Sequence, residues 1–278
     1  MKPIEASTCV DAWLQGCDYL LTQEQDDWRA YNIVSEIANP IALPPGERAV
    51  VDFLNRFLTE RGGLPFNTVV NTIFPAQLYQ RHGAAGVYDR YVLDVLKHVL
   101  DHPDCKWGTY AQRILCRKDR DGTEFSPLKE LVAKLKCQLA ICGTNRGTYE
   151  LGLLDPVLDI PIYDPGSSDR SRPNGGPCLS HISVKLTAGR KLMLTGFYRS
   201  HCYIQRALGN LFGLAHLQHF IAQETALELG PLVCHSSMAQ LELSRRKKSA
   251  PAHERWGNDD IRELIACCHS LRRMKVAA

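Results

Sequence analysis

One cysteine stands where a nucleophile could act. Cys178 follows Pro177 at the end of residues 155–177, which are rich in Pro, Gly, Ser and Asp, and it precedes a predicted strand. Long irregular segments inside compact domains are often functional. A thiol at the edge of a sheet can be accessible, and its thiolate can attack an electrophilic carbon to form a covalent intermediate. The pattern makes Cys178 a candidate nucleophile, with a buried core thiol as the alternative.

Polar residues after the second of two predicted strands suit a phosphorylated ligand. Arg199 and Ser200 begin 21 residues after Cys178. A guanidinium near a cysteine lowers the pKa of the thiol, and an arginine with a serine can hold a phosphate through several hydrogen bonds. Asn210 stands at the start of an otherwise apolar predicted helix, and its amide can both donate and accept at the edge of a nucleobase. Together these residue types predict a nucleotide site.

The elements that must position these residues follow from apolar periodicity. Helical spacing predicts helices over residues 9–22, 47–58, 88–100, 127–138, 204–228 and 258–273. Alternation between turn residues predicts strands over residues 31–37, 181–186, 191–198 and 231–235. Ala188-Gly189 predicts a hairpin, and Gly230-Pro231 is predicted to end the long helix. Helices interspersed with strands, without a repeat or a linker, predict a single α+β domain over residues 1–278 with a mixed sheet.

Composition limits the class of protein. Hydrophobic residues make up 45% of the chain and charged residues 23%, as in a globular protein, and no apolar run approaches the ~20 residues that span a bilayer. The N-terminus lacks the features of a signal peptide, so we expect a cytoplasmic protein. Eleven cysteines without that signal predict free thiols, and the lack of a CxxC pair argues against a metal site. A net charge of +3 does not favour a nucleic-acid polymer as ligand.

The second half of the chain resembles the thymidylate synthase family. Residues 198–201 (Tyr-Arg-Ser-His) and 210–214 (Asn-Leu-Phe-Gly-Leu) are similar to the family's Arg-Ser-x9-Asn signature, and residues 177–178 (Pro-Cys) precede it at close to the family's spacing. Residues 108–110 (Gly-Thr-Tyr) are similar to the family's Gly-x-x-Tyr loop. The small apolar tail, residues 274–278, is similar to the segment with which the family covers its folate.

This resemblance implies a fold and a reaction. It implies a thymidylate synthase-like mixed sheet with surrounding helices. Cys178 would add to C6 of a pyrimidine nucleoside monophosphate, and C5 would then take a one-carbon unit from 5,10-methylenetetrahydrofolate as a methyl or hydroxymethyl group. Tyr110 would lie near the reacting C5, and Arg199 with Ser200 would hold the phosphate.

Further contacts are implied for the base, the sugar and the partner subunit. Asn210 would contact the N3 and O4 edge of the pyrimidine, which favours uracil. Gln240 stands in the family's sugar-binding pair. The resemblance also implies a homodimer, in which Arg146 would reach the partner's phosphate site and Arg29 would belong to a flexible phosphate loop.

The chain also departs from the family pattern. Leu179 follows the nucleophile where the family usually has histidine, and Cys202 stands where an aspartate helps to hold the folate. The family's His-x-Tyr pair, which binds the sugar, aligns with Gln240 and Glu242, or with Met238 and Gln240 in a second register. In either register the pair is lost, which suggests an altered nucleotide as substrate.

Three hypotheses remain open. The first is a specialised C5-methylase or C5-hydroxymethylase that acts through Cys178, and the altered sugar and folate positions favour it. The second is an ordinary thymidylate synthase that converts dUMP to dTMP. The third is a non-catalytic nucleotide-binding relative in which Cys178 is dispensable. The family's catalytic glutamate has no clear match, since Glu60 is the nearest acid and stands in a different context, and this favours the third hypothesis.

Overall fold

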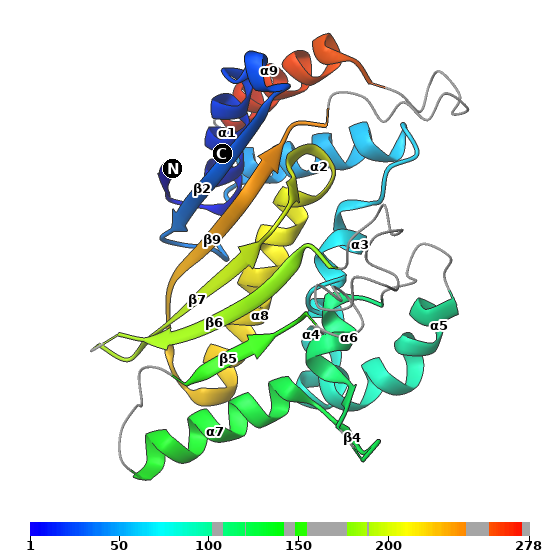
Figure 1. The fold of residues 1–278 in the computed structure, drawn as a ribbon, viewed down its shortest axis with the longest axis vertical. Coiled ribbons are helices and arrows are strands. Elements are labelled where there is room, and N and C mark those ends of the chain that lie inside the picture. Colours follow the sequence, from blue (N-terminus) through cyan, green and yellow to red (C-terminus); the bar gives the residue numbers. More distant parts are fainter. Residues whose placement is uncertain are drawn as a thin grey trace, which may run out of the picture.

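Strands from all parts of the chain meet in one mixed sheet. The computed structural model describes residues 1–101, 108–119, 121–141, 148–154, 177–187, 189–242 and 256–273. Its main sheet has seven strands in the order β1-β2-β9-β7-β6-β5, with β8 paired to β9 beside this path (Figure 1). The strands are β1 (Lys2–Ala6), β2 (Arg29–Ile37), β5 (Tyr149–Gly152), β6 (Leu179–Leu186), β7 (Lys191–Tyr198), β8 (His201–Cys202) and β9 (Glu228–Gln240).

Helices cover one face of this sheet and both ends of the molecule. The long apolar helix α8 packs against β7 and β9, whereas α1 packs against β1 and β2 (Figure 1). The α-helices are α1 (Cys9–Leu21), α2 (Pro45–Thr59), α3 (Phe66–Asn71), α4 (Ala76–Ala85), α5 (Leu96–Asp101), α6 (Tyr110–Leu115), α7 (Pro127–Ile141), α8 (Leu208–Thr225) and α9 (Asn258–Arg273). Two short strands, β3 (Arg117–Lys118) and β4 (Glu124–Phe125), form a separate ribbon.

The alternation of side chains along the strands separates a buried face from an open one. Paired residues such as Leu194 and Leu232 are fully buried beneath the helices, and the buried apolar side chains of the described ranges form one cluster. The intervening residues, among them Val34, Phe197 and Val233, point to the other face. None of the helices described for this chain is both long and apolar enough to cross a membrane.

Most of the predicted elements are confirmed. The predictions for residues 9–22, 47–58, 127–138 and 258–273 correspond to α1, α2, α7 and α9. The strands predicted on either side of residues 188–189 are β6 and β7, which pair antiparallel; Ala188 itself lies outside the described residues. The helix predicted over residues 88–100 is divided between a π-helical segment, Gly86–Val95, and α5. The predicted α+β class with a mixed sheet and surrounding helices is therefore confirmed.

The predicted end of the long helix was wrong. A π-helical turn, Tyr203–Ala207, leads into α8, which already ends at Thr225. Ala226 then adopts a left-handed conformation (φ 52°), and β9 starts at Glu228 and runs on through Gly230 and Pro231. The pairing of β9 with β7 shifts at this point, so the sheet accommodates a proline inside a strand by means of an irregularity.

A buried glutamine on α8 holds this irregularity in place. The Nε2 group of Gln218 lies 2.8 Å from the carbonyl oxygen of Leu192, 2.9 Å from that of Gly230 and 3.2 Å from that of Pro231. Gln218 is fully buried. Its amide therefore donates to backbone carbonyls of both strands at the point where their register shifts.

Candidate active site

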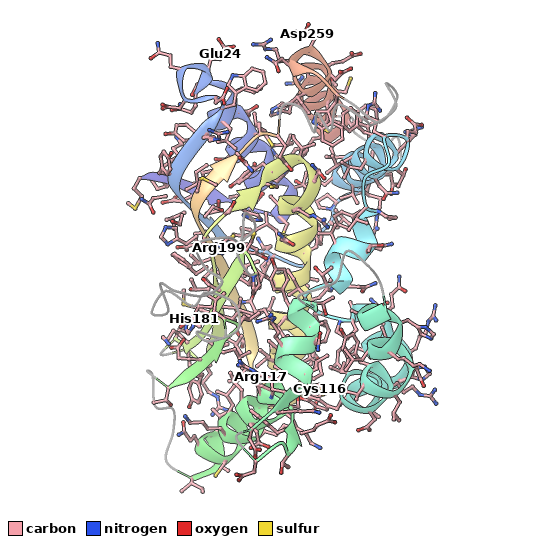
Figure 2. All side chains as sticks on the ribbon, turned by 45° about the vertical axis from the view of Figure 1, so that its right-hand side comes forward. Glu24, Cys116, Arg117, His181, Arg199 and Asp259 are labelled. Carbon is pink, nitrogen blue, oxygen red and sulfur yellow. The ribbon has the colours of Figure 1, made fainter. Side chains whose placement is uncertain are left out.

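Cys178 lies at the entrance to β6, beside the end of β7. The backbone N–H of Arg199 donates to the carbonyl oxygen of Cys178 at 3.0 Å, and the Nε of Arg199 donates to the carbonyl oxygen of Pro177 at 3.1 Å. Antiparallel pairing of Leu179 with Tyr198 places these residues opposite each other. The guanidinium group is thereby fixed against the turn that carries the thiol. Figure 2 places Arg199 near the middle of the long axis of the molecule.

Tyr110 comes from a distant part of the chain to the same turn. It is the first residue of α6, which Thr109 caps by accepting the backbone N–H of Gln112. The Tyr110 hydroxyl oxygen accepts the backbone N–H groups of Cys178, at 3.2 Å, and of Leu179, at 3.3 Å. Burial and the nearby Cys178 raise the pKa of Tyr110 to about 12, so the phenol keeps its proton at neutral pH.

The thiol of Cys178 has opposing influences on its pKa. Burial raises the pKa of Cys178, because the thiolate loses hydration, whereas the positive charges of Arg199 and Arg206 lower it. Burial has the larger effect, so the thiol form predominates at neutral pH. Catalysis through Cys178 would require a group that accepts this proton or a ligand that changes the local charge.

Asn210 lies at the first turn of α8 and meets a buried histidine. The Nδ2 group of Asn210 is 3.1 Å from Nε2 of His201, and Nδ1 of His201 is 2.8 Å from the Ser236 hydroxyl oxygen. All three side chains are buried. The His201 ring stacks on Tyr198, with ring centroids 4.1 Å apart and planes at 3°. The Asn210 amide, which the sequence predicts to contact the base, therefore belongs to a buried hydrogen-bonded network that joins α8 to β8 and β9.

The residues near β8 form a second polar group. The Nε2 of Gln240 donates to the sulfur of Cys202 at 3.4 Å. Glu242 follows β9, and its carboxylate accepts the backbone N–H of Ile204, at 2.8 Å, and of Gln205, at 3.3 Å. These donors belong to the π-helical turn before α8, so Glu242 caps the start of the helix that carries Asn210. Burial raises the pKa of Glu242.

For the remaining predicted site residues within the described ranges, the structure gives a position but no hydrogen bond to Cys178. Ser200 is half-buried directly after Arg199. Arg29 is exposed at the start of β2, where it is paired in register with Gln240 and lies 3.6 Å from the carboxylate of Asp27. Arg146 and the C-terminal tail lie outside the described residues. Glu60 pairs with Arg61 at 3.8 Å at the end of α2.

One aromatic and one basic residue near Cys178 were not among the site residues predicted from the sequence. Tyr198 is fully buried, its ring centroid is 6.5 Å from that of Tyr110, and its hydroxyl has no hydrogen-bond partner among the described residues. Arg206 affects the pKa values of both Cys178 and Tyr110. Tyr198 stands in the run that carries the family resemblance, but only the fold shows that it pairs with Leu179, that burial raises its pKa, and that Cys178 lies close enough to raise this pKa further. Within the described ranges, no group of three His, Cys, Asp or Glu side chains could hold a metal ion.

Comparison with known proteins supports the fold. No family model matches the sequence, and no curated protein matches it. Among solved structures, the chain is similar to the thermostable thymidylate synthase A from Bacillus subtilis, with a TM-score of 0.54 and 16% sequence identity. The match covers 93% of this chain and 84% of the synthase. The chain therefore has a thymidylate synthase-like fold.

Proposed function

We propose that this protein transfers a one-carbon unit to C5 of a pyrimidine nucleoside monophosphate through a covalent adduct of Cys178. One observation carries the proposal: the Tyr110 hydroxyl and the Arg199 guanidinium both bind the turn of Cys178 within a thymidylate synthase-like fold. Three residues of the types that this chemistry needs, drawn from separate elements, thus meet at one point. A chance core cysteine would not require this arrangement.

The proposed reaction begins with the thiolate of Cys178. Its electron pair forms a bond to C6 of the pyrimidine, and the electrons of the C5–C6 double bond move toward C5 and O4, so that C5 becomes nucleophilic. C5 then bonds to a one-carbon electrophile, whose bond to its carrier would break as water adds to give a hydroxymethyl group or as hydride from the carrier adds to give a methyl group. Loss of the C5 proton and departure of the thiolate restore the C5–C6 double bond. Tyr110 keeps its proton and orients the backbone that presents the sulfur.

The remaining contacts would position the nucleotide. Arg199 and Ser200 are proposed to bind the phosphate, because a guanidinium and a hydroxyl give several charge-assisted hydrogen bonds. Asn210 is proposed to bind the base edge, and Gln240 the sugar. Gln240 has an amide where the family has a member of its sugar-binding His-x-Tyr pair. For this reason we propose that the substrate is an altered nucleotide rather than dUMP.

The one-carbon donor is proposed to be 5,10-methylenetetrahydrofolate. The described residues fit this cofactor only in part. Cys202 stands in the place of the family's aspartate, and burial raises the pKa of its thiol to about 12, so it offers no negative charge. The neighbouring Glu242 carboxylate is already committed to two backbone N–H groups. We therefore assign no step of the reaction to the folate.

The test is a product assay on the purified protein. The protein is incubated with methylenetetrahydrofolate and, separately, with UMP, dUMP, CMP or dCMP, and the product masses are read. A methyl or hydroxymethyl gain on one nucleotide is expected. A gain on dUMP alone, as a methyl group, would favour an ordinary thymidylate synthase. No gain on any nucleotide, combined with measurable nucleotide binding, would favour a non-catalytic relative.

The open face of the sheet supports the further proposal that two copies of the chain pair. It combines apolar side chains, including Val34, Phe197 and Val233, with Glu150 and Lys185, which form an ion pair. None of the described helices covers it, and Figure 2 shows His181 on this side, away from the helices. A surface that carries both apolar groups and both signs of charge can be complementary to itself, as a two-fold interface requires.

Pairing through this face predicts that Phe197→Glu gives a monomer. A charge buried at the centre of an apolar interface has no partner, and its desolvation is costly. Sedimentation equilibrium at tens of micromolar should give twice the chain mass for the wild type and one chain mass for the variant. Leu93→Glu, at a residue that is 75% exposed on the π-helical segment, is the matched control and should remain a dimer. A monomeric wild type would contradict the proposal.

A further inference from the structure

The Asn210 amide is held by a chain of neutral polar groups. His201, Asn210 and Ser236 are 2%, 5% and 1% exposed. The chain of hydrogen bonds therefore runs from Ser236 on β9, through His201 on β8, to Asn210 at the first turn of α8. Each link is buried, so water does not compete for it.

The tautomer of His201 determines which end of the amide it binds. Burial lowers the pKa of His201 to about 3, so the ring is neutral at physiological pH. A neutral imidazole has one donor and one acceptor nitrogen. With Nε2 accepting from the Asn210 Nδ2 group, Nδ1 carries the proton and donates to Ser236. The His201 ring is also fixed in place, because it stacks on Tyr198 and meets Tyr203 edge-on at 5.5 Å.

An asparagine alone does not choose between uracil and cytosine. Uracil presents a donor at N3 and an acceptor at position 4, whereas cytosine presents an acceptor at N3 and a donor at position 4. Rotation of an amide by 180° exchanges its oxygen and nitrogen, so an unrestrained asparagine can serve either base. A neighbour that binds only one end of the amide removes this freedom.

We propose that His201 is a positioning residue that fixes the orientation of the Asn210 amide and thereby sets the preference for uracil over cytosine at the proposed nucleotide site. This inference rests on the proposed function. Reversing the amide would require His201 to change its tautomer and Ser236 to change its donor role together, so the chain resists rotation. Leu179, beside the nucleophile, is fully buried and apolar and cannot supply such a contact.

The test compares nucleotide binding in three proteins without any folate. Dissociation constants for UMP, dUMP, CMP and dCMP are measured by calorimetry for the wild type, His201→Phe and His201→Gln. Phenylalanine keeps an aromatic ring on Tyr198 but removes both nitrogens, whereas glutamine keeps a group that can donate and accept. Circular dichroism confirms that each variant is folded at the assay temperature.

We expect the wild type to bind the uracil nucleotide at least about tenfold more tightly than its cytosine counterpart, the factor of one well-made hydrogen bond. In His201→Phe this ratio should fall to about threefold or less, and in His201→Gln it should be largely restored. General damage to the site would weaken both nucleotides equally and leave the ratio unchanged. An unchanged ratio in His201→Phe overturns the assignment of His201 while the proposed function stands.

A second measurement separates failure of this inference from failure of the proposed function. Nitrogen-15 NMR of the ligand-free protein should show His201 as a neutral ring protonated at Nδ1, and the Asn210 side-chain amide should lose its exchange protection in His201→Phe. If the wild type binds none of the four nucleotides, the proposed function and the base preference both fail. An Asn210 amide that is unprotected in the wild type would refute the positioning role on its own.

Discussion

Cys178→Ala is expected to abolish product formation in the nucleotide assay, with a loss of about four orders of magnitude or more. Without the sulfur, no bond forms at C6, and C5 does not become nucleophilic. Losses of this size are typical when a covalent nucleophile is removed. Nucleotide binding should persist, since Arg199, Ser200 and Asn210 are unchanged. The measurement is the initial rate of product formation by mass spectrometry, together with a binding isotherm for the same nucleotide.

Two further variants make this result interpretable. Cys137→Ala removes an exposed thiol on α7 and should retain full activity. Cys178→Ser keeps nearly the same volume, and it should match the melting temperature of the wild type while remaining inactive. Full activity in Cys178→Ala would refute the covalent mechanism and leave Cys178 as a partly buried core thiol.

Arg199→Leu is expected to have the second largest effect, because this one residue acts on both the thiol and the turn. The positive charge of Arg199 lowers the pKa of Cys178, and its Nε binds the carbonyl oxygen of Pro177. Alkylation of Cys178 by iodoacetamide at pH 8 should slow by roughly tenfold, which corresponds to ~1.4 kcal/mol. Phosphate binding should also be lost, so nucleotide affinity should fall by a similar or larger factor.

The pH profile of alkylation gives the sign of the effect. Only the thiolate reacts, and burial raises the pKa of Cys178, so the wild-type rate should rise with pH through the range in which this thiol loses its proton. Removing a neighbouring positive charge raises that pKa further, so the profile of Arg199→Leu should move to higher pH. Arg199→Lys should recover part of the shift, and Arg48→Leu, at an exposed residue of α2, should not change the profile. A profile that stays in place in Arg199→Leu would show that the guanidinium does not act on the thiol.

The closeness of Cys178 to Arg199 was predictable from the sequence. The two residues lie ten positions on either side of the hairpin signal that the sequence carries at residues 188–189. An antiparallel hairpin centred there must bring them together, as the pairing of β6 and β7 does. Apolar periodicity likewise sufficed for α1 and α2, whose buried stripes are continuous.

Other features depend on packing that no local pattern records. β9 continues through Gly230 and Pro231, which locally signal a turn, because Gln218 binds the carbonyl groups of the irregular strand. Tyr110 joins the site across 68 residues of sequence, at the start of a short helix that has little periodicity of its own. His201 and Asn210 are separated by a change from strand to helix, so no single repeat relates their directions.

The helix α8 is fastened to the sheet at two levels. Asn210 is bound near its first turn by His201, and Gln218 is bound farther along by backbone carbonyls, eight residues or ~12 Å away along the axis. Sliding of the helix by one turn, or rotation about its axis, would break both attachments at once and leave buried amides unpaired. These two attachments thus fix both the axial position and the rotation of α8. Folding alone therefore puts Asn210 in place, before a ligand binds.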